Sequence, residues 1–415
     1  MTFVKKFDNG LRLIIEKIDG LLSVSTGVLV KTGSVNESKN TNGISHFIEH
    51  VLFKGTDKRS AFEISDYIDT IGASINAFTS KEVTCYYTKS TYEHTEETME
   101  VLSDLFFNSK LDSAELEKEK GVIIEEINMS EDTPEDLLFN LLAENYYGKN
   151  GFGQSILGPE KNIKKFTKED ALAYMDKYYT ADNVVISVAG NVDVDSVTKY
   201  VEKYFVNNFK RKKSAKQFTT KQTYTANTYK YKKIEQCHVG LAIPGIDALD
   251  DRYEAVSAAN IVLGGGMSSR LFQKIREEMG LAYSVYSYSS AYKDQGVIEF
   301  YAGVNPTSRD KTVEEMIKVI NTFTKDGVTE KELLRGKEQM KSSLIMGRES
   351  TSSQMLTFGK YLLLYDQVFN IEERMQKINE LKVDYVNKVI KEVFKLDKVC
   401  AATVGPKRKP VELSI

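Results

Sequence analysis

Hydrophobic and polar positions alternate with two different periods along the first half of the chain. Residues 11–17 and 21–31 carry apolar and β-branched side chains at nearly every second position, which predicts two strands. Residues 33–43 are polar and rich in turn formers, and a helical period then continues to Phe53. The strand pattern returns at residues 74–90. This part of the chain is therefore predicted to mix strands and helices.

Helical periods dominate the rest of the first half, with one buried strand near its end. The expected helices cover residues 61–71, 93–108, 113–129, 134–147, 167–179 and 194–205, and the expected strand covers residues 183–189. Thr167 is followed three residues later by Asp170, a pattern that resembles a capping box and marks the start of a helix.

The same order of elements begins again in the second half. Strands are predicted at residues 238–244 and 283–288, and helices between them at 251–263 and 269–279. Placing residues 51–53 over 261–263 brings Gly72 within two residues of Gly280. Self-similarity of this kind predicts an internal duplication of about 200 residues.

The repeat divides the chain into two domains joined by a linker. We expect a first domain at residues 1–208, a linker at 209–229 and a second, homologous domain at 230–415. The polar stretch opens on four basic residues at 210–213 and has almost no aliphatic side chains. A short basic cluster could contact nucleic acid, but a solvated connection between domains is the more common meaning of this composition.

Length and composition place the chain among ordinary globular proteins. With 415 residues it is too long for one compact core, which agrees with two domains. A net charge of −3 gives no reason to expect nucleic acid as a partner. No apolar run reaches the roughly 18 residues that cross a membrane, and residues 1–8 lack the apolar core of a signal peptide. We therefore expect a cytoplasmic protein with no membrane partner.

Three cysteines, Cys85, Cys237 and Cys400, lie far apart in the sequence and form no CxxC pair. An odd and scattered set favours a reducing compartment, without disulfides and without thiolate-bound zinc. We expect these side chains to be small, buried apolar groups.

A pattern that suits a metal stands in the helix expected after the turn-rich segment. The chain reads His46-Phe47-Ile48-Glu49-His50 there, and this motif holds two of its four histidines. Residues four apart share one face of a helix, so both imidazoles can bind one ion. Two imidazoles suit zinc, which needs a third protein ligand and an open water position for catalysis. Glu49 is then placed to take a proton from that water and to pass it to a leaving amine.

The second copy of the repeat lacks these groups. In the register above, the residues of the motif fall on apolar and amide side chains: His46, Glu49 and His50 on Val256, Ala259 and Asn260. Because valine and alanine offer no ligand atoms, the second copy is expected to be degenerate and to have a different task.

The third ligand cannot be chosen by spacing alone. Glu119 and Glu126, in the helix expected at residues 113–129, are seven apart and therefore share one helix face. Glu126 also follows the apolar Val122 and Ile123, which suggests a carboxylate carried into a packed environment. The other acids of this helix are expected to be solvated: Glu115, Glu117 and Glu125.

At these residues the chain resembles the pitrilysin family of zinc peptidases, which includes insulin-degrading enzyme and the mitochondrial processing peptidase. The resemblance lies in the motif His46 to His50 and in the segment after it, Val51-Leu52-Phe53-Lys54-Gly55-Thr56. It extends over essentially the whole chain, including a degenerate second copy. It implies an α+β fold of two homologous α/β-sandwich domains, each with an antiparallel-rich sheet packed with helices.

The resemblance also implies a complete site. The family's third zinc ligand is a Glu 76 residues after the second His, which is Glu126 here. A second acid seven residues earlier, here Glu119, supports the site in the family. The implied centre is one zinc ion per chain held by His46, His50 and Glu126, with Glu49 as general base and acid.

Two further segments look like the family's substrate contacts. Asn76, Ala77 and Phe78 resemble an edge strand whose free N–H and C=O groups bind an extended peptide as an added strand. Arg276 and Tyr283 resemble an Arg/Tyr pair that grips the substrate backbone and steadies the tetrahedral intermediate. Without the resemblance, the segment at residues 76–78 is more commonly an internal strand, and residues such as Arg276 and Tyr283 more commonly have a structural role.

The function that the resemblance implies is a zinc-dependent metalloendopeptidase for unfolded peptides. Family members with a complete chamber in one chain carry four such domains, whereas this chain has two, so a homodimer that encloses a chamber is expected. Each zinc helix would then face Arg276 and Tyr283 of the partner subunit. The alternative is a non-catalytic peptide-binding or assembly subunit of the same fold. Such relatives usually lose a ligand or the catalytic Glu, and this chain keeps them.

Overall fold

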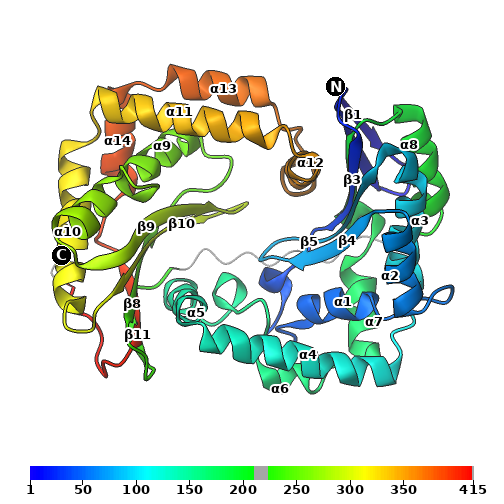
Figure 1. Ribbon diagram of the computed structural model, residues 1–415, viewed down its shortest axis with the longest axis horizontal. Coiled ribbons are helices and arrows are strands. Elements are labelled where there is room, and N and C mark those ends of the chain that lie inside the picture. Colours follow the sequence, from blue (N-terminus) through cyan, green and yellow to red (C-terminus); the bar gives the residue numbers. More distant parts are fainter. Residues whose placement is uncertain (210–222, 414–415) are drawn as a thin grey trace. The chain divides into compact units, whose positions relative to one another are not determined.

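Two compact units make up the chain, each built on one β-sheet (Figure 1). The computed structural model describes residues 1–209 and 223–413. Of these, residues 1–127, 155–209 and 346–369 form the first unit, and residues 128–154, 223–345 and 370–413 form the second.

The units interleave along the sequence, whereas the predicted domains 1–208 and 230–415 are continuous. The reason is tertiary packing, because the late helix α12 (Thr351–Tyr365) packs on the first sheet and the early helix α5 (Pro134–Tyr147) packs on the second. Residues 210–222 of the predicted linker at 209–229 lie outside the described part of the chain.

Six strands form the sheet of the first unit, in the order β1-β2-β6-β3-β5-β4. Their bounds are Thr2–Lys6 (β1), Arg12–Lys17 (β2), Ser23–Val30 (β3), Ser74–Thr79 (β4), Thr84–Thr91 (β5) and Val184–Gly190 (β6). β2 and β6 run parallel, and the other neighbouring pairs are antiparallel. The strand pattern predicted at 74–90 covers two strands, because the chain reverses where Ser80 Oγ donates to the carbonyl of Val83 at 2.8 Å. This reversal leaves β4 at the edge of the sheet.

Helices cover both faces of the first sheet. Besides α12 they are α1 (Ile44–Leu52), α2 (Ala61–Thr70), α3 (Thr95–Asn108), α4 (Ser113–Asp132), α6 (Glu160–Ile163), α7 (Lys168–Tyr178), α8 (Val194–Val201) and the π-helical Glu202–Val206. Short 3₁₀ turns of this unit lie at Ser34–Asn36, Tyr92–His94 and Ala181–Asn183. Along β2, Leu13 and Ile15 pack in the core that α1, α3 and α7 share, whereas Ile14 packs with α12. Burial on both faces explains the unbroken apolar run of this strand.

α12 packs very close to the sheet. A Cβ atom at Gly27 would overlap Sδ of Met355, and one at Gly359 would lie 2.8 Å from Cδ1 of Leu29. Ser187 Oγ donates a hydrogen bond to the carbonyl of Met355 at 2.7 Å. The two glycines therefore let the helix and the strands approach to a distance that a side chain would prevent.

The sheet of the second unit has five strands, in the order β7-β11-β8-β10-β9. Their bounds are Asn227–Tyr231 (β7), Cys237–Pro244 (β8), Ala282–Ala291 (β9), Gly296–Val304 (β10) and Cys400–Gly405 (β11). Its helices, besides α5, are α9 (Tyr253–Gly264), the π-helical Phe272–Glu278, α10 (Arg309–Asp326), α11 (Glu330–Gly347), α13 (Ile371–Glu380) and α14 (Val383–Val393). A second hydrophobic core, which includes Phe300, Phe323 and Phe394, joins them to the sheet.

The two sheets have the same topology once β1 is set aside. β2, β6, β3, β5 and β4 correspond in order and relative direction to β7, β11, β8, β10 and β9. A helix follows the middle strand in both, α1 after β3 and α9 after β8. The predicted fold class, an α+β arrangement of two homologous α/β-sandwich domains, is confirmed.

α9, which corresponds to α1 in the second unit, contributes to the packing of that unit. Val256 and Ala259 of α9 are buried in the core of the second unit. Asn260, which takes the place of His50 in the sequence register, accepts a hydrogen bond from Ser287 Oγ at 2.8 Å. At the positions where α1 carries ionisable side chains, α9 carries side chains that make packing contacts and a hydrogen bond within the second unit.

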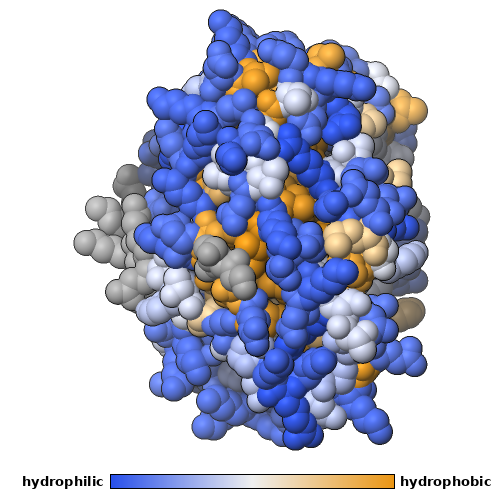
Figure 2. Space-filling model, turned by 90° about the vertical axis from the view of Figure 1, so that its left-hand side faces the viewer, coloured by the Kyte–Doolittle hydropathy of each residue, from blue (hydrophilic) through white to orange (hydrophobic). Residues whose placement is uncertain are grey.

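One face of the molecule is mainly polar (Figure 2), and the three cysteines are buried. The face shown in Figure 2 is mainly hydrophilic, with apolar side chains in narrow stretches between polar ones. Among the residues that the structure describes, no helix has both the length and the apolar character to cross a bilayer. Cys85, Cys237 and Cys400 are buried and form no disulfide, as predicted.

Candidate metal centre

The helix with the two histidines, α1, has a well-defined start. Gly43 precedes it with a φ of 98°, a conformation that favours glycine. The carboxylate of Glu37 accepts hydrogen bonds from the N–H groups of Gly43 (2.8 Å) and Ser45 (2.9 Å), and from Nδ2 of Asn42 (2.9 Å). Burial raises the pKa of Glu37, while these donors act to lower it. The first N–H groups of a helix have no helical carbonyl to which they can donate. The Glu37 carboxylate accepts hydrogen bonds from these groups, and so it fixes where α1 begins.

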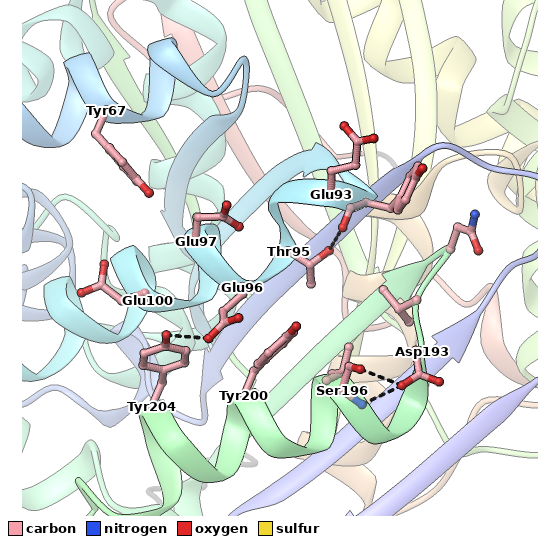
Figure 3. A pocket seen from close by; sticks show the side chains of 14 residues that line it. Tyr67, Glu93, Thr95, Glu96, Glu97, Glu100, Asp193, Ser196, Tyr200 and Tyr204 are labelled. Atoms are coloured by element: carbon pink, nitrogen blue, oxygen red, sulfur yellow. Dashed lines mark hydrogen bonds between the residues drawn. The ribbon is translucent and has the colours of Figure 1, made fainter.

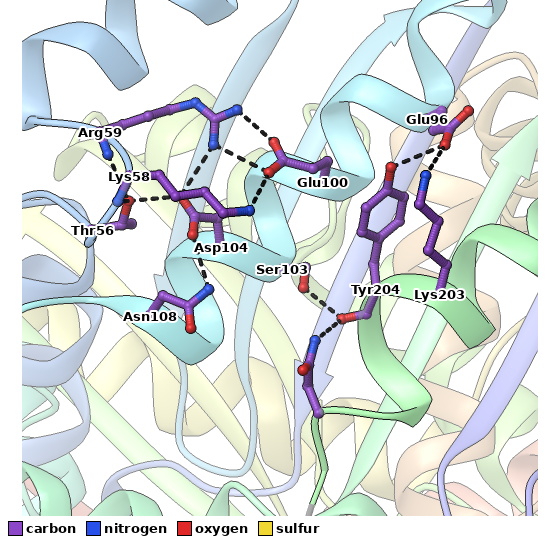
Figure 4. Close-up of polar contacts among 11 residues, drawn as sticks. Thr56, Lys58, Arg59, Glu96, Glu100, Ser103, Asp104, Asn108, Lys203 and Tyr204 are labelled. Carbon is purple, nitrogen blue, oxygen red and sulfur yellow. Dashed lines mark hydrogen bonds and ion pairs between the residues drawn. The ribbon is translucent and has the colours of Figure 1, made fainter.

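A polar network with α3 holds the segment that follows α1 (Figure 4). Arg59 donates to Glu100 through Nη2 at 2.7 Å and to Asp104 through Nη1 at 3.1 Å. Thr56 Oγ1 also donates to Asp104, at 2.6 Å, and Lys58 Nζ donates to Glu100 at 2.9 Å. Asp104 is only 2% exposed, so these donors are needed to compensate its charge. Both ends of α1 are therefore anchored by side-chain contacts.

Three possible ligand atoms converge between α1 and α4. Nε2 of His46 lies 3.2 Å from Nε2 of His50, and Oε2 of Glu126 lies 3.6 Å from the first nitrogen and 3.4 Å from the second. Zinc binds such ligands at about 2.0–2.1 Å, so two ligands of a tetrahedral ion lie about 3.3–3.4 Å apart. The observed separations match the edges of that tetrahedron closely. Within the described residues, these three form the group of His, Cys, Asp or Glu side chains that could hold one ion.

The protonation of the two imidazoles suits a cation. Burial, and secondly the neighbouring His50 ring, lowers the pKa of His46 to about 3, so this ring is neutral near neutral pH. Nδ1 of His46 is buried and has no hydrogen-bond partner in the described part of the chain. Nδ1 of His50 lies 2.8 Å from Oε1 of Glu119, and by donating its proton there it leaves Nε2 with a lone pair. When both Nε2 atoms carry a lone pair, these two nitrogens and the carboxylate oxygen are arranged to bind a cation that lies between them.

Glu119 itself is fixed from a second side. It is buried, and its other oxygen, Oε2, lies 2.6 Å from Nζ of Lys54. The pair of contacts orients the carboxylate and, through it, the ring of His50. Carboxylates in this position set the ring orientation and the basicity of metal-binding histidines.

Glu49 lies beside the converging atoms without joining them. Thr79 Oγ1, at the end of β4, donates a hydrogen bond to Oε2 of Glu49 at 2.5 Å. Burial raises the pKa of Glu49 and nearby Glu126 adds to the rise, while Thr79 and His50 oppose it. A raised pKa makes the ionised carboxylate a stronger base, as proton transfer near neutral pH requires.

β4 gives this site a free strand edge. β5 pairs with one side of β4, and no strand within the described residues pairs with its other side. Ala77 packs in the core on the α1 side of the sheet, and Phe78 packs on the α12 side. Asn76 is exposed. The three residues thus lie on an edge to which an extended peptide could add, and their contact with a substrate stays a prediction.

Arg276 and Tyr283 contact each other within the second unit. Cζ of Arg276 lies 5.0 Å from the centroid of the Tyr283 ring and 4.6 Å from that of Phe272. Tyr283 is 75% exposed, so its ring is open to solvent on the side that Arg276 does not cover. The pairing of the two side chains is thus observed, while their role toward a substrate stays a prediction.

A cavity of about 640 Å³ on the first unit is a second candidate site (Figure 3). α2, α3, α8 and the segments next to them line it with acids and tyrosines. Glu96 accepts hydrogen bonds from Lys203 Nζ and Tyr204 OH, both at 2.9 Å, and Asp193 accepts one from the N–H of Ser196 at the start of α8, also at 2.9 Å. Much of the negative charge is therefore engaged in structural contacts, and the cavity includes none of the predicted site residues.

The sequence reasoning missed three residues that shape the metal centre: Glu37, Lys54 and Thr79. A signal existed for each of them. Glu37 is an acid shortly before a helix start, Lys54 follows His50 by one helical turn, and Thr79 shares the strand period of Ala77. The partners of Lys54 and Thr79, Glu119 and Glu49, lie on elements that only the fold brings next to them. The partners of Glu37 are local, at the start of α1.

Two family models match the chain. The one described as Insulinase (Peptidase family M16) matches residues 13–160, and the one described as Peptidase M16 inactive domain matches residues 165–340. The chain is 43% identical over 389 residues to an uncharacterized zinc protease, YmxG, of Bacillus subtilis, covering 94% of this chain and 95% of that protein. It is 36% identical over 404 residues to an uncharacterized zinc protease of Rickettsia felis, covering 97% of each.

Solved structures share the fold over nearly the full length. A peptidase M16 inactive domain from Pseudomonas fluorescens superposes with a TM-score of 0.91 at 21% identity, covering 99% of this chain and 100% of that one. A protease from Helicobacter pylori superposes with a TM-score of 0.89 at 24% identity, covering 98% and 99%. At these identities the likeness concerns the fold alone.

Proposed function

Since the chain belongs to peptidase family M16, we propose that it is a zinc-dependent endopeptidase that cleaves unfolded peptides or protein segments. The observation that carries this proposal is the convergence of Nε2 of His46, Nε2 of His50 and Oε2 of Glu126, with Glu49 beside them. Zinc is the metal that fits both the donor set and the names of the bacterial relatives.

The three convergent side chains would hold one zinc ion per chain. A zinc ion in such a site supplies Lewis-acid activation of water and polarisation of the substrate carbonyl. His46, His50 and Glu126 leave room for a non-protein ligand, because a tetrahedral site has four positions. Glu119 keeps His50 in the orientation in which Nε2 faces the ion, and Lys54 holds Glu119 in place.

Glu49 moves the proton. Its carboxylate takes a proton from the attacking water and later delivers one to the nitrogen of the leaving peptide. Thr79 holds Oε2, which leaves Oε1 for the proton. The burial that raises the pKa of Glu49 supports this role, since the group must both accept and release a proton near neutral pH.

The substrate would bind along β4. An extended peptide can pair with the free edge at Asn76, Ala77 and Phe78, and main-chain hydrogen bonds then select conformation more than side-chain identity. Arg276 would bind a backbone carbonyl, and Tyr283 would donate to the developing oxyanion.

We propose a homodimer as the working form, by resemblance to family members that enclose a chamber. In it, Arg276 and Tyr283 of the partner subunit would contact the peptide held at β4. A closed chamber admits unfolded peptides and excludes folded domains. Molar mass measured by light scattering at micromolar concentration tests this point, and a fully active monomer would reject it.

The function itself is tested by mass-spectrometric mapping of cleavage in a diverse peptide pool, with wild type and Glu49→Gln compared. We expect the variant to keep its zinc and to lose about 10³-fold in turnover, as removal of a general base does. Glu125→Gln, an exposed acid of α4, is the matched control and keeps both properties. A wild-type rate in Glu49→Gln would remove Glu49 from the mechanism. A wild type that holds zinc and binds peptides without cutting any of them would favour the non-catalytic alternative.

A further inference from the structure

A lysine that forms no ion pair within the described residues lies next to the proposed substrate strand. Nζ of Lys360, on α12, lies 5.2 Å from the centroid of the Phe78 ring on β4. The side chain is partly buried, and among the described residues its ammonium group takes part in no hydrogen bond or ion pair. Burial lowers the pKa of Lys360, which reflects the cost of removing its charge from water. Buried charges in proteins are normally paired, so this one needs an explanation.

Burial outweighs the electrostatic attraction that neighbouring groups exert on Lys360. Cys85 and Glu82 are the groups that act on it electrostatically. Burial raises the pKa of the Cys85 thiol far above its ordinary value, so the thiol is neutral near neutral pH. Glu82, in the turn between β4 and β5, attracts the charge of Lys360 electrostatically. The ammonium is thus left with the face of an aromatic ring as its direct contact.

α12 is fixed on the sheet on both sides of Lys360. Before it, Thr351 shares a hydrogen bond with Ser25 at 2.9 Å. After it, the carbonyl of Leu362 accepts one from Nη1 of Arg12 at 2.9 Å. The glycine beside it, Gly359, lies directly on the strands. The backbone of Lys360 therefore has a set position relative to β4, as a residue that reads a ligand requires.

The pleat of β4 decides which side chains of a bound peptide could meet Lys360. Thr79 reaches Glu49 on the α1 face, and its neighbour Phe78 reaches Lys360 on the α12 face. A peptide added to the outer side of β4 would alternate in the same way. Every second side chain of that peptide would therefore point to the α12 face, away from the metal centre.

We propose that Lys360 selects substrates with an aspartate or glutamate at a position that faces α12 when the peptide is bound on β4. This inference rests on the proposed function, because it takes β4 as the substrate strand. The carboxylate of the peptide supplies an ion-pair partner, which the described residues do not provide for Lys360. Its contact lies on the face of the peptide opposite to α1, so it adds side-chain selectivity to a backbone-based mode of binding.

The test uses pairs of cleavable peptides that differ only by Glu or Gln at one position, scanned along the sequence. The readout is the ratio of kcat/KM for the two members of each pair. Wild type should prefer Glu by about tenfold at one position or at positions two apart, the value of one charge-assisted hydrogen bond. Lys360→Met should bring this ratio to about one, Lys360→Arg should keep it, and Lys360→Glu should reverse it in favour of the Gln peptide of the pair.

A matched lysine controls for the loss of a charge. Lys177, on α7, also lies over an aromatic ring, with Nζ 4.9 Å from the centroid of Tyr178. Lys177→Met should keep the wild-type ratio. A wild-type ratio near one at every position, or a Lys360→Met protein that keeps the preference, would overturn the proposal.

A binding measurement distinguishes the proposed selectivity of Lys360 from the proposed peptide hydrolysis. The same peptides can be titrated into zinc-loaded Glu49→Gln protein and followed by fluorescence anisotropy. A Glu preference in binding that depends on Lys360, with no cleavage by wild type, would reject hydrolysis and retain the selectivity. Cleavage together with equal affinity for Glu and Gln peptides would retain hydrolysis and reject the role of Lys360.

Discussion

Oε1 of Glu119 and Nδ1 of His50 lie 2.8 Å apart, and this contact connects α4 to the histidine ring on α1. Because the ring nitrogen donates to the carboxylate, the opposite nitrogen is free to bind a metal. In the proposed zinc site, Glu119 would be a positioning residue that acts on the metal through His50. Its contribution can be separated from that of the ligands themselves.

Glu119→Gln should weaken zinc binding without abolishing it. An amide oxygen can still accept from His50, but it lacks the charge that makes the ring more basic, so we expect a loss of about 10- to 100-fold in zinc affinity. Competition with a chromophoric chelator measures this affinity. Glu125→Gln on the same helix should bind zinc as the wild type does, and an unchanged affinity in Glu119→Gln would show that His50 needs no orienting acid.

Thr79→Val should slow the reaction and leave zinc content unchanged. The change removes the hydrogen bond that holds Oε2 of Glu49, so the base samples other orientations. We expect kcat/KM to fall by about tenfold, the value of one hydrogen bond to a charged group. Thr79→Ser keeps the hydroxyl and should restore most of the activity. Equal rates in the valine and serine variants would argue that Glu49 is oriented by other contacts.

Asp104→Ala should destabilise the first unit. The buried carboxylate is the acceptor for Thr56 and Arg59, and its removal leaves the Arg59 guanidinium with one fewer counter-charge. We expect the free energy of unfolding to fall by about 3 kcal/mol, as for other broken buried pairs. Urea denaturation measures the change, with the exposed Asp195→Ala as control. A loss no larger than that of the control would mean that the network does not anchor the segment after α1.

The ion pair of Glu332 with Arg270 should make the second unit sensitive to acid. Hydrogen bonds from Arg270, and then from Thr329, lower the pKa of Glu332 from 4.5 to about 2. A group with a lowered folded-state pKa stabilises the protein above its unfolded pKa, and this contribution is lost as the pH falls through the folded-state value. Glu332→Gln should therefore cost about 1 kcal/mol near neutral pH, a value reduced for partial exposure. The difference in unfolding free energy from wild type should shrink between about pH 4.5 and 2, and a constant difference across that window would contradict the assignment.

Local patterns were sufficient for much of the fold. β2 and β3 were predicted from apolar and β-branched side chains near period two, and β6 from a buried apolar run. The cap at Thr167 is confirmed, since its hydroxyl accepts from the N–H of Asp170 at 3.2 Å. The place of α12 was not predictable, because the contact that fixes it joins Gly27 to Met355, far apart in the sequence. The interleaving of the two units follows from this packing and was missed for the same reason.

In the candidate site too, the sequence predicted the local contacts and missed most contacts between distant elements. His46 and His50 lie one turn apart on the same face of α1, so helical geometry alone brings their side chains together. Glu126 comes from another helix, and spacing alone left it among several acids until the family resemblance favoured it. The sequence signals at Lys54 and Thr79 did not identify their partners, and Lys360 gave no signal, because each contacts a residue that comes close only after folding.

Zinc content of the purified protein and three variants tests the central claim most directly. After dialysis against zinc and removal of the free metal, elemental analysis should give about one zinc per chain for wild type and for Glu125→Gln, because a site of two imidazoles and a carboxylate binds one ion tightly. His50→Gln and Glu126→Gln should retain far less, since each removes a ligand from the converging group. One tightly held zinc per chain in the His50→Gln protein would contradict the account.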